Sequence, residues 1–527
     1  MIDLESLISA LSGEGAKSLL GPHYGVHPDL IKERAEKLIG LAAAFREYFP
    51  SERRAVLFRI PGRINLMGVH IDHRGGWCNY MPIARETFFC ASPRNDDRIC
   101  CRNVSPQHPP IDFSLTADFP FDRRGSWMEF IEGASIERGH WGNYIKAGAF
   151  KMQDMTPDLP LTGMNLVMDG DIPPRSGLSS SSTLVVGSVL ALSYVNELFY
   201  PDYEQVELCG EAEWYVGTRG GCGDHAAMIL GDLNRIVHVG FMPLSASYCS
   251  LPENVEVVLA QSGVQADKAV RARETFNARI AAYEAAFEIY RDAHPAYRDR
   301  LEHIRDISPA NLEASPGDFY QTLKAVPVRA SQEDLQRTHP HLRGAWERIF
   351  TTYGAPGEPL PLREVLLFGV SECARARRFM ERMKENDLAG AGRLMFTSHD
   401  GDRVAVWEGG RSRPYQSRYD DRYLDELTER VRESPEDEAV KIAWQPGGYR
   451  CSVPEMDRLV DRCKKLEGVY GAGLTGAGLG GAILALTHPD ASAHVVDELT
   501  ELIAEWCDAP FVERCRPAGG AALLELS

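Results

Sequence analysis

The chain has 527 residues, which is several times the usual size of one domain and predicts two or more domains. Hydrophobic residues make up 44% and charged residues 25%, so the chain can bury large cores and global disorder is excluded. Its 57 Lys and Arg against 75 Asp and Glu give a net charge of −18. This charge argues against general binding to nucleic acid or to anionic membranes, although it leaves room for a local basic pocket.

The cysteine pattern and the N-terminus favour a cytoplasmic protein. Twelve cysteines are too few for a disulfide scaffold, and no CxxC pair provides zinc-ligand spacing. The start of the chain carries Asp3 and Glu5 without basic residues, which is unlike a signal peptide. The longest apolar stretch, near Leu184 to Val195, is shorter than the roughly 20 residues that span a bilayer. We expect small-molecule partners, no nucleic acid or membrane partner, and a monomer or small homo-oligomer.

The first half of the chain mixes helices and strands. Residues 1–50 have helical apolar spacing, and AVLFRIPGRINLMG predicts a strand that runs into a Pro-Gly turn. TLVVGSVLALSYVNELF is apolar nearly all round and predicts a buried helix. Further strands are expected at ETFFCASP, RICCRNV, MNLVMDG and VEVVLAQSG, the last of which opens the second half.

The second half is expected to carry two insertions. Residues 267–308 and 370–396 read as helices. Residues 309–365, rich in Pro and Gly, and the charged residues 401–448 are interpreted as insertions. A Gly-rich stretch, GVYGAGLTGAGLGGAILALT, follows between a helix and a strand. Strands and helices without strict alternation predict an α+β fold rather than a doubly wound sheet.

Two Gly-rich segments are candidate phosphate sites. In SGLSSSSTL, Gly177 and the serines from Ser179 to Ser182 precede the buried helix, whose N-terminal N–H groups and dipole would suit an anion. A Ser-rich cap on a core helix is the alternative. In LTGAGLGGA, Gly476 and Gly478 would allow a close backbone approach to a ligand, with a flexible turn as the alternative.

Two further segments gather polar side chains. RIPGRINLMGVHIDHRGG places Arg63, His70 and Asp72 near glycines, which suggests a ligand pocket or else a solvated loop. In GTRGGCGDHAAMILG, Asp224 follows a Gly-rich turn and precedes an apolar helix. Asp224 is either an ordinary N-cap or a carboxylate that the helix dipole keeps ionised for chemistry.

The four segments together resemble the GHMP kinases, and among them the galactokinases most. PGRINLMGVHIDHRGG is similar to the signature PGRxNLxGEHxDYxGG, and SGLSSSSTL to the phosphate-loop motif GLSSSAS. GTRGGCGDH is similar to GxxCGIMDQ, and LTGAGLGGA to MTGGGFGG. Weaker matches, such as GNYIKAG and YRCSVPEMDRLV, extend the resemblance from about residue 40 to the C-terminus, apart from the two insertions.

The resemblance implies a two-domain α+β fold with the active site in the interdomain cleft. Residues 1–245 would form the N-terminal domain, with the sugar and phosphate-loop motifs, and residues 246–527 the C-terminal domain. The implied activity is ATP-dependent phosphorylation of the anomeric hydroxyl of galactose or a galactose-like sugar, with ATP and Mg²⁺ bound in the cleft.

The resemblance also assigns roles to residues. Asp224 would take or align the proton of the sugar hydroxyl, and Arg63 would keep Asp224 ionised and stabilise charge on the phosphoryl group. The implied ATP-binding residues are Gly177, Ser179, Ser180, Ser181, Gly476 and Gly478. Ser180 would also hold Mg²⁺, and either Glu211 or Glu213 would join it. The implied sugar-binding residues are His70, Asp72, Val69, Gly220, Gly221 and Phe276.

Departures from the family pattern leave the sugar open. Val69 stands where the family has a Glu that accepts from the 6-hydroxyl of galactose, and Phe276 stands at a family Tyr. An unpartnered hydroxyl would cost about 1–3 kcal/mol, so galacturonate, L-arabinose or a 6-deoxy sugar are alternatives to galactose. Lys268 and Arg273 could serve a uronate, and Arg175 could touch phosphate, although solvated side chains are the favoured interpretation for all three. A non-catalytic sugar sensor is the alternative of another class.

Overall fold

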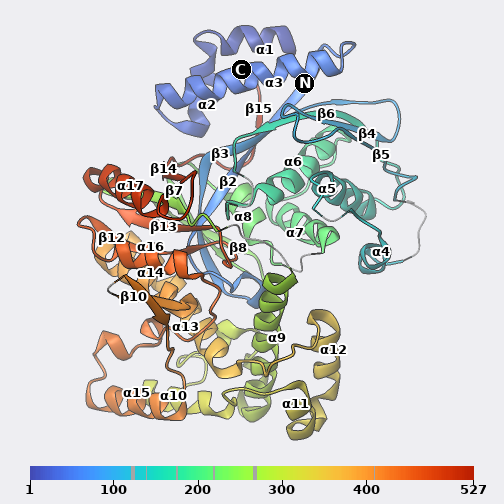
Figure 1. The fold of residues 1–527 in the computed structure, drawn as a ribbon. Helices are drawn as coiled ribbons and strands as arrows, with labels where there is room; N and C mark the ends of the chain where they lie inside the picture. Colours follow the sequence, from blue (N-terminus) through green and yellow to red (C-terminus); the bar gives the residue numbers. More distant parts are fainter. Residues whose placement is uncertain are drawn as a thin grey trace.

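The computed structural model describes residues 1–119, 125–137, 139–173, 176–217, 220–264, 270–408 and 410–526, without the side chains of residues 270–273 and 408. Helices and sheets are mixed without strict alternation, which confirms the predicted α+β class (Figure 1). Among the described helices, none is long and apolar enough to cross a membrane. All twelve cysteines lie in the described part and are free thiols.

A nine-stranded sheet forms the first half of the molecule. Its central path runs β1-β2-β3-β6-β4-β5, while β15 pairs with β2, β7 with β3, and β8 with β7. Its strands are β1 (Ile2–Asp3), β2 (Arg54–Met67), β3 (Trp77–Pro93), β4 (Arg98–Asn103), β5 (Ile111–Ser114), β6 (Met164–Gly170), β7 (Arg235–Gly240), β8 (Ser245–Ser250) and β15 (Ala522–Leu524).

Helices cover both faces of this sheet, because successive side chains of β2 point to opposite sides. Val56, Phe58 and Ile60 pack in the core under the helices that follow β5, whereas Leu57 packs under the N-terminal helices. The N-terminal layer is α1 (Leu4–Leu11), α2 (Gly15–Tyr24) and α3 (Pro28–Tyr48), as expected for residues 1–50. The other layer holds α4 (Trp127–Gly133), α5 (Gly142–Met155), α6 (Ser180–Val195), α7 (Asp202–Glu213) and α8 (Gly223–Leu230).

The predicted turn at Pro61 is wrong. β2 continues through Pro61 and Gly62, and its register against β3 shifts at that point. The shift leaves Ala84 and Arg85 of β3 without a partner in β2. Because β2 does not turn there, it carries Arg63 onward to the loop that contains His70.

A four-stranded sheet, β12-β13-β9-β14, forms the second half. Its strands are β9 (Glu256–Gln261), β12 (Val469–Thr475), β13 (Ala482–Thr487) and β14 (Val512–Cys515). The expected Gly-rich connection is therefore partly strand, since β12 takes its first half and only residues 476–481 form the turn to β13. The predicted boundary at residue 245 coincides with the start of β8, which still pairs with β7 of the first sheet.

Helices from the second half pack around this sheet and below it. They are α9 (Val270–Ala293), α13 (Leu362–Lys384), α14 (Leu388–Asp402), α16 (Pro454–Cys463) and α17 (Pro489–Ile503). The two predicted insertions contain α10 (Pro316–Thr322), α11 (Gln332–Thr338) and α12 (Arg343–Tyr353), and the hairpin β10 (Ala405–Glu408) and β11 (Arg411–Pro414) with α15 (Asp421–Glu433).

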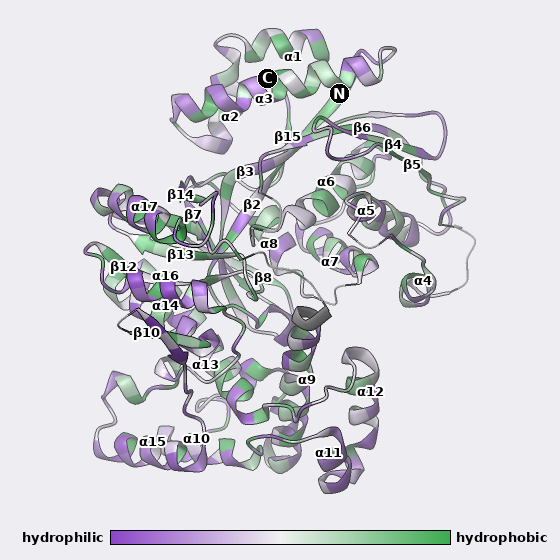
Figure 2. Ribbon diagram, viewed as in Figure 1, coloured by the Kyte–Doolittle hydropathy of each residue, from purple (hydrophilic) through white to green (hydrophobic). Residues whose placement is uncertain are grey.

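The two predicted insertions meet in space although they are far apart in sequence. α10 packs on α15, and Tyr320 donates its hydroxyl to the Val440 carbonyl at 2.5 Å. Arg363 pairs with Asp421 at 2.5 Å across the same boundary. Figure 1 shows α10, α11, α12 and α15 together below both sheets, and Figure 2 shows mainly hydrophilic residues along α11 and α15. We call this group of helices the lower lobe.

Candidate active site

The candidate phosphate loop ends where α6 begins. Gly177 and Ser179 both have positive φ, of 78° and 60°, so the chain makes a tight left-handed approach to the helix. Ser179 is the N-cap residue, and Ser180 is the first residue of α6. The first N–H groups of a helix have no partner within it and carry the positive end of its dipole. This geometry suits an anion, and phosphate binding at this loop stays a prediction.

Asp224 lies beside this loop and is held by two groups. The structure places it in the first turn of α8, where Cys222 is the N-cap residue, so its carboxylate is not a helix cap. Arg63 Nε donates to Asp224 Oδ1 at 2.7 Å, and the Ser179 hydroxyl donates to Asp224 Oδ2. Arg63 Nη1 donates in turn to the Gly177 carbonyl at 2.7 Å. Three predicted motifs thus meet at one carboxylate.

The exposure of this group suits a reactive carboxylate. Arg63 is 4% exposed, while the Asp224 side chain is 35% exposed. The guanidinium is therefore fixed within the protein, and the carboxylate still reaches the solvent side from which a ligand would come. The buried guanidinium and the Ser179 hydroxyl thus fix the position of a carboxylate that stays accessible from solvent.

The Gly-rich motif LTGAGLGGA, from the second half of the chain, also reaches this site. A Cβ at Gly476 would lie 3.1 Å from the Gly177 carbonyl oxygen, and one at Gly177 would lie 3.4 Å from the Thr475 carbonyl oxygen. The turn between β12 and β13 therefore lies directly against the phosphate loop. Gly478 faces another way, because its Cβ would lie 2.2 Å from the Cys451 carbonyl oxygen. Its close approach is to protein backbone, and its predicted contact with ATP stays a prediction.

Glu211 and Glu213, the two candidate carboxylate ligands of Mg²⁺, differ in their contacts. Glu213 accepts from the Ser182 hydroxyl at 2.7 Å and from the Ser181 hydroxyl at 3.3 Å. Glu211 instead pairs with Lys151 at 2.8 Å and is 47% exposed. Hydroxyl and carboxylate oxygens are the hard donors that Mg²⁺ takes. The donor set at the start of α6 therefore fits this cation, with Glu213 as its carboxylate.

Asp72 forms a second centre, next to the Gly-rich turn before α8. A Cβ at Gly221 would lie 2.4 Å from Asp72 Oδ2, and one at Gly223 would lie 3.0 Å from it. His73 Nδ1 lies 3.0 Å from Asp72 Oδ1. Burial alone would raise the pKa of Asp72, but its hydrogen bond with His73 and the nearby His70 lower that pKa to about 2. Asp72 is thus an ionised hydrogen-bond acceptor. Its carboxylate has room because Gly221 and Gly223 carry no side chain.

His70 is buried in a strained loop beside aromatic rings. Its φ is 64°, and its ring stacks on Tyr449 with centroids 4.2 Å apart. His70 Nε2 lies 3.3 Å from Asp402 Oδ1. Left-handed backbone at a non-glycine residue persists only where the surroundings hold it. Here a ring stack and a carboxylate from the second half of the chain do so.

Val69 is held through its backbone by a residue that the sequence analysis missed. Glu372 Oε1 accepts from the Gly68 N–H at 3.0 Å and from the Val69 N–H at 3.2 Å. Its other oxygen accepts from Arg375 Nε at 2.6 Å, and both side chains are fully buried. Nothing in the sequence around Glu372 distinguishes it from an exposed helix residue, because only the packing of α13 against this loop gives it this role.

Phe276 is not part of this aromatic group. It is partly buried in the first half of α9 and makes no ring contact with any described residue of the loop. The ring that α9 brings to the loop is Tyr283, whose centroid lies 6.4 Å from that of His73. A sugar contact of Phe276 stays a prediction. Arg175, Lys268 and the side chain of Arg273 lie outside the described residues.

Side chains from α9, from α12 of the lower lobe and from Arg305 hold the same loop. Arg74 pairs with Glu284 of α9 at 2.9 Å, and Tyr353 of α12 donates to Glu284 at 2.7 Å. Arg305 donates to the Gly75 carbonyl at 2.8 Å. A segment interpreted as an insertion therefore touches the network that fixes the loop of Asp72.

Comparison with known families decides the relationship. The sequence matches the family described as GHMP kinases N terminal domain over residues 143–232, and GHMP kinases C terminal over residues 422–504. Residues 43–93 match the galactokinase galactose-binding signature. The chain belongs to the GHMP kinase family. The C-terminal match begins inside the second predicted insertion, and the galactose-binding signature contains Arg63, His70 and Asp72.

Individual relatives agree with this assignment. A galactokinase of Dictyostelium discoideum is 25% identical over 471 residues, covering 86% of this chain and 85% of that protein. One of Chloroflexus aggregans is 28% identical over 466 residues, covering 88% and 90%. The crystal structure of Lactococcus lactis galactokinase complexed with galactose has a TM-score of 0.61 at 20% identity, covering 91% and 98%, and supports the fold.

Proposed function

We propose that this GHMP kinase transfers the γ-phosphoryl group of ATP to the anomeric hydroxyl of galactose or a galactose-like sugar. The observation that carries the proposal is the joined arrangement of Asp224, Arg63 and Ser179 at the N-terminus of α6. A carboxylate held next to a candidate anion site is what phosphoryl transfer to a hydroxyl requires. The galactose-binding signature and the similarity to galactokinases support the choice of sugar.

Each of these residues would have its own role in the phosphoryl transfer. Asp224 would accept or align the proton of the attacking hydroxyl, while Arg63 would hold Asp224 in place and stabilise charge on the transferred group. The N-terminus of α6 would bind the phosphates, with the turn at Gly476 beside it. Asp72 would accept hydrogen bonds from two neighbouring sugar hydroxyls, because an ionised carboxylate has acceptor sites for both.

Ser180 and Glu213 are the residues that would hold Mg²⁺. When bound, the cation would neutralise charge on the phosphates. Of Glu211 and Glu213, we propose Glu213, because its contacts with the Ser181 and Ser182 hydroxyls of α6 support it. We further propose a cytoplasmic protein that acts as a monomer or small homo-oligomer.

The test is ADP release with Mg-ATP and a panel of galactose, galacturonate, L-arabinose, fucose and N-acetylgalactosamine. Galactose turnover with sugar 1-phosphate detected by phosphorus NMR is the expected result. Preference for galacturonate or L-arabinose would instead identify a kinase of the same family with another sugar. In the Asp224→Ala variant, ADP release should vanish while the fold is kept. A chain that releases no ADP with any sugar would favour the sensor interpretation.

A further inference from the structure

Several buried polar atoms near Val69 have no hydrogen-bond partner. They are His70 Nε2, Asp402 Oδ2, Tyr283 Oη and Tyr449 Oη. The Asp402 side chain is fully buried and that of His70 nearly so. More than nine-tenths of buried polar groups in proteins have a partner, so four without one in a single place call for a specific explanation.

These atoms belong to side chains that touch one another. The rings of His70 and Tyr449 stack with centroids 4.2 Å apart, and the rings of Tyr283 and Tyr449 lie 5.3 Å apart. Asp402 Oδ1 lies 3.3 Å from His70 Nε2 and accepts from the Cys451 N–H at 3.2 Å. Asp402 Oδ2 is thus the one oxygen of this carboxylate that is still free to accept.

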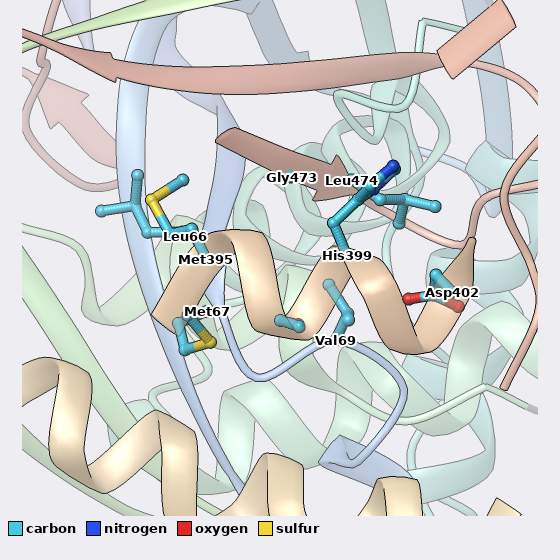
Figure 3. Close-up of a pocket in the computed structure, with 9 residues that line it drawn as sticks. Leu66, Met67, Val69, Met395, His399, Asp402, Gly473 and Leu474 are labelled. Carbon is cyan, nitrogen blue, oxygen red and sulfur yellow. The ribbon is translucent and has the colours of Figure 1, made fainter. Parts of the chain in front are cut away.

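Asp402 and Val69 also line the same small cavity. Figure 3 shows this cavity between the loop that carries Val69 and the end of α14, with Asp402 in its wall. Its volume is about 10 Å³, which is room for one water-sized group. The other walls are mostly apolar, with Leu66, Met67, Met395 and Leu474 among them. An O–H group entering this cavity could donate to Asp402 Oδ2, which has no other partner among the described residues.

We infer that Asp402 is a further sugar-binding residue, which accepts a hydrogen bond from one hydroxyl of the sugar beside His70. The inference rests on the proposed function and refines its substrate class. A carboxylate group is larger than this cavity, whereas a hydroxyl fits it, so the site selects a hydroxyl over a uronate. A carboxylate from α14 thereby replaces the acceptor that Val69 lacks.

The experiment compares galactose with its 2-, 3-, 4- and 6-deoxy forms, and with galacturonate, in the wild-type enzyme and in Asp402→Asn. The amide keeps an oxygen for the Cys451 N–H and removes the charge. For one deoxy sugar, wild type should favour galactose by about 10- to 100-fold in kcat/KM, the worth of a hydrogen bond to a charged acceptor. In Asp402→Asn that one ratio should fall to within about threefold of unity, while the other ratios stay unchanged.

Asp457→Asn is the matched control. Asp457 is also buried and lies 3.1 Å from His399, a histidine that lines the cavity, but Asp457 itself does not line it, so the variant tests a neighbouring buried carboxylate. Its variant should leave all sugar ratios unchanged. If Asp402→Asn fails to fold, Val69→Leu provides the second variant. The larger side chain fills the cavity and should bring the same galactose-to-deoxy-sugar ratio of kcat/KM close to unity.

The outcomes separate this inference from the proposed function. Wild-type enzyme that turns over galactose, with every deoxy ratio unchanged in Asp402→Asn, would overturn the inference and leave the kinase assignment intact. Such a result would mean that Asp402 only holds His70 or a structural water. Wild-type enzyme that phosphorylates none of the sugars would instead overturn the proposed function.

Discussion

A single methyl group at Gly221 should damage sugar binding. The Cβ of an alanine at this position would lie 2.4 Å from Asp72 Oδ2, 2.8 Å from its Cγ and 3.1 Å from the His73 backbone nitrogen. The contact with Oδ2 is shorter than real Cβ atoms show, so the Asp72 carboxylate must move. Asp72 cannot move freely, because it is hydrogen-bonded to His73 and packed against the same turn.

The size of the effect follows from this clash. Overpacking of this kind costs about 1–3 kcal/mol, and the displaced carboxylate no longer points at the sugar. We therefore expect KM for the sugar to rise about 10- to 100-fold in Gly221→Ala, with KM for ATP within about twofold of wild type. Initial rates of ADP release, with each substrate varied in turn, would measure both constants.

Gly220→Ala is the matched control, since a Cβ at Gly220 meets no atom within 4 Å. Both variants lose the same backbone flexibility, but only one meets Asp72. If both raised KM for the sugar equally, flexibility rather than the contact with Asp72 would be responsible, and the reasoning would be refuted. An unchanged KM in Gly221→Ala would show that Asp72 does not bind the sugar.

Four further predictions concern the residues around these centres. Arg63→Lys should lower kcat about 10²- to 10³-fold, because lysine lacks the fork that joins Asp224 to the Gly177 carbonyl. Glu372→Ala should reduce the free energy of unfolding in urea by about 3–5 kcal/mol, since it leaves Arg375 as a buried unpaired charge. Tyr353→Phe should raise KM for the sugar about 3- to 10-fold without changing KM for ATP, because it frees Glu284 from one of its partners. The pKa of Asp72 falls from 3.8 to about 2 on folding, so the stability that its charge contributes should be complete above about pH 4 and be lost between about pH 4 and pH 2, as measured by comparing urea unfolding of wild type and Asp72→Asn across pH.

Controls for these variants come from the same chain. Arg85→Lys also disrupts an arginine–carboxylate pair, with Glu513, but this pair does not include Asp224, so the variant should keep kcat. Glu381→Ala removes an exposed partner of Arg378 from the helix that carries Glu372, and should change stability by less than about 1 kcal/mol. A similar loss in variant and control would contradict the role given to Arg63 or Glu372. For Asp72, stability that declined already between pH 7 and pH 5 would contradict the low pKa.

Much of the site could be read from the sequence because its motifs are local. A loop that binds phosphate at a helix N-terminus needs glycines and hydroxyls within a few residues, so Gly177 and Ser179 are visible without a structure. The same holds for Asp224 after its glycines. The α+β class and several elements, among them α3, α6, β6 and β9, also follow from apolar spacing. The turn expected at Pro61 was wrong, because pairing of β2 with β3 overrides the local preference of Pro-Gly through a bulge.

What the sequence could determine was therefore the identity of the short motifs, their order and the family that they imply. Only the tertiary structure decided which distant residues complete the site. Glu213 rather than Glu211 meets the serines, Glu372 holds the backbone of Val69, and Asp402 lies beside His70 although more than 300 positions separate them. The physical reason is that a buried carboxylate needs a partner or a ligand, and which group supplies it depends on the packing of α13 and α14 against the first sheet.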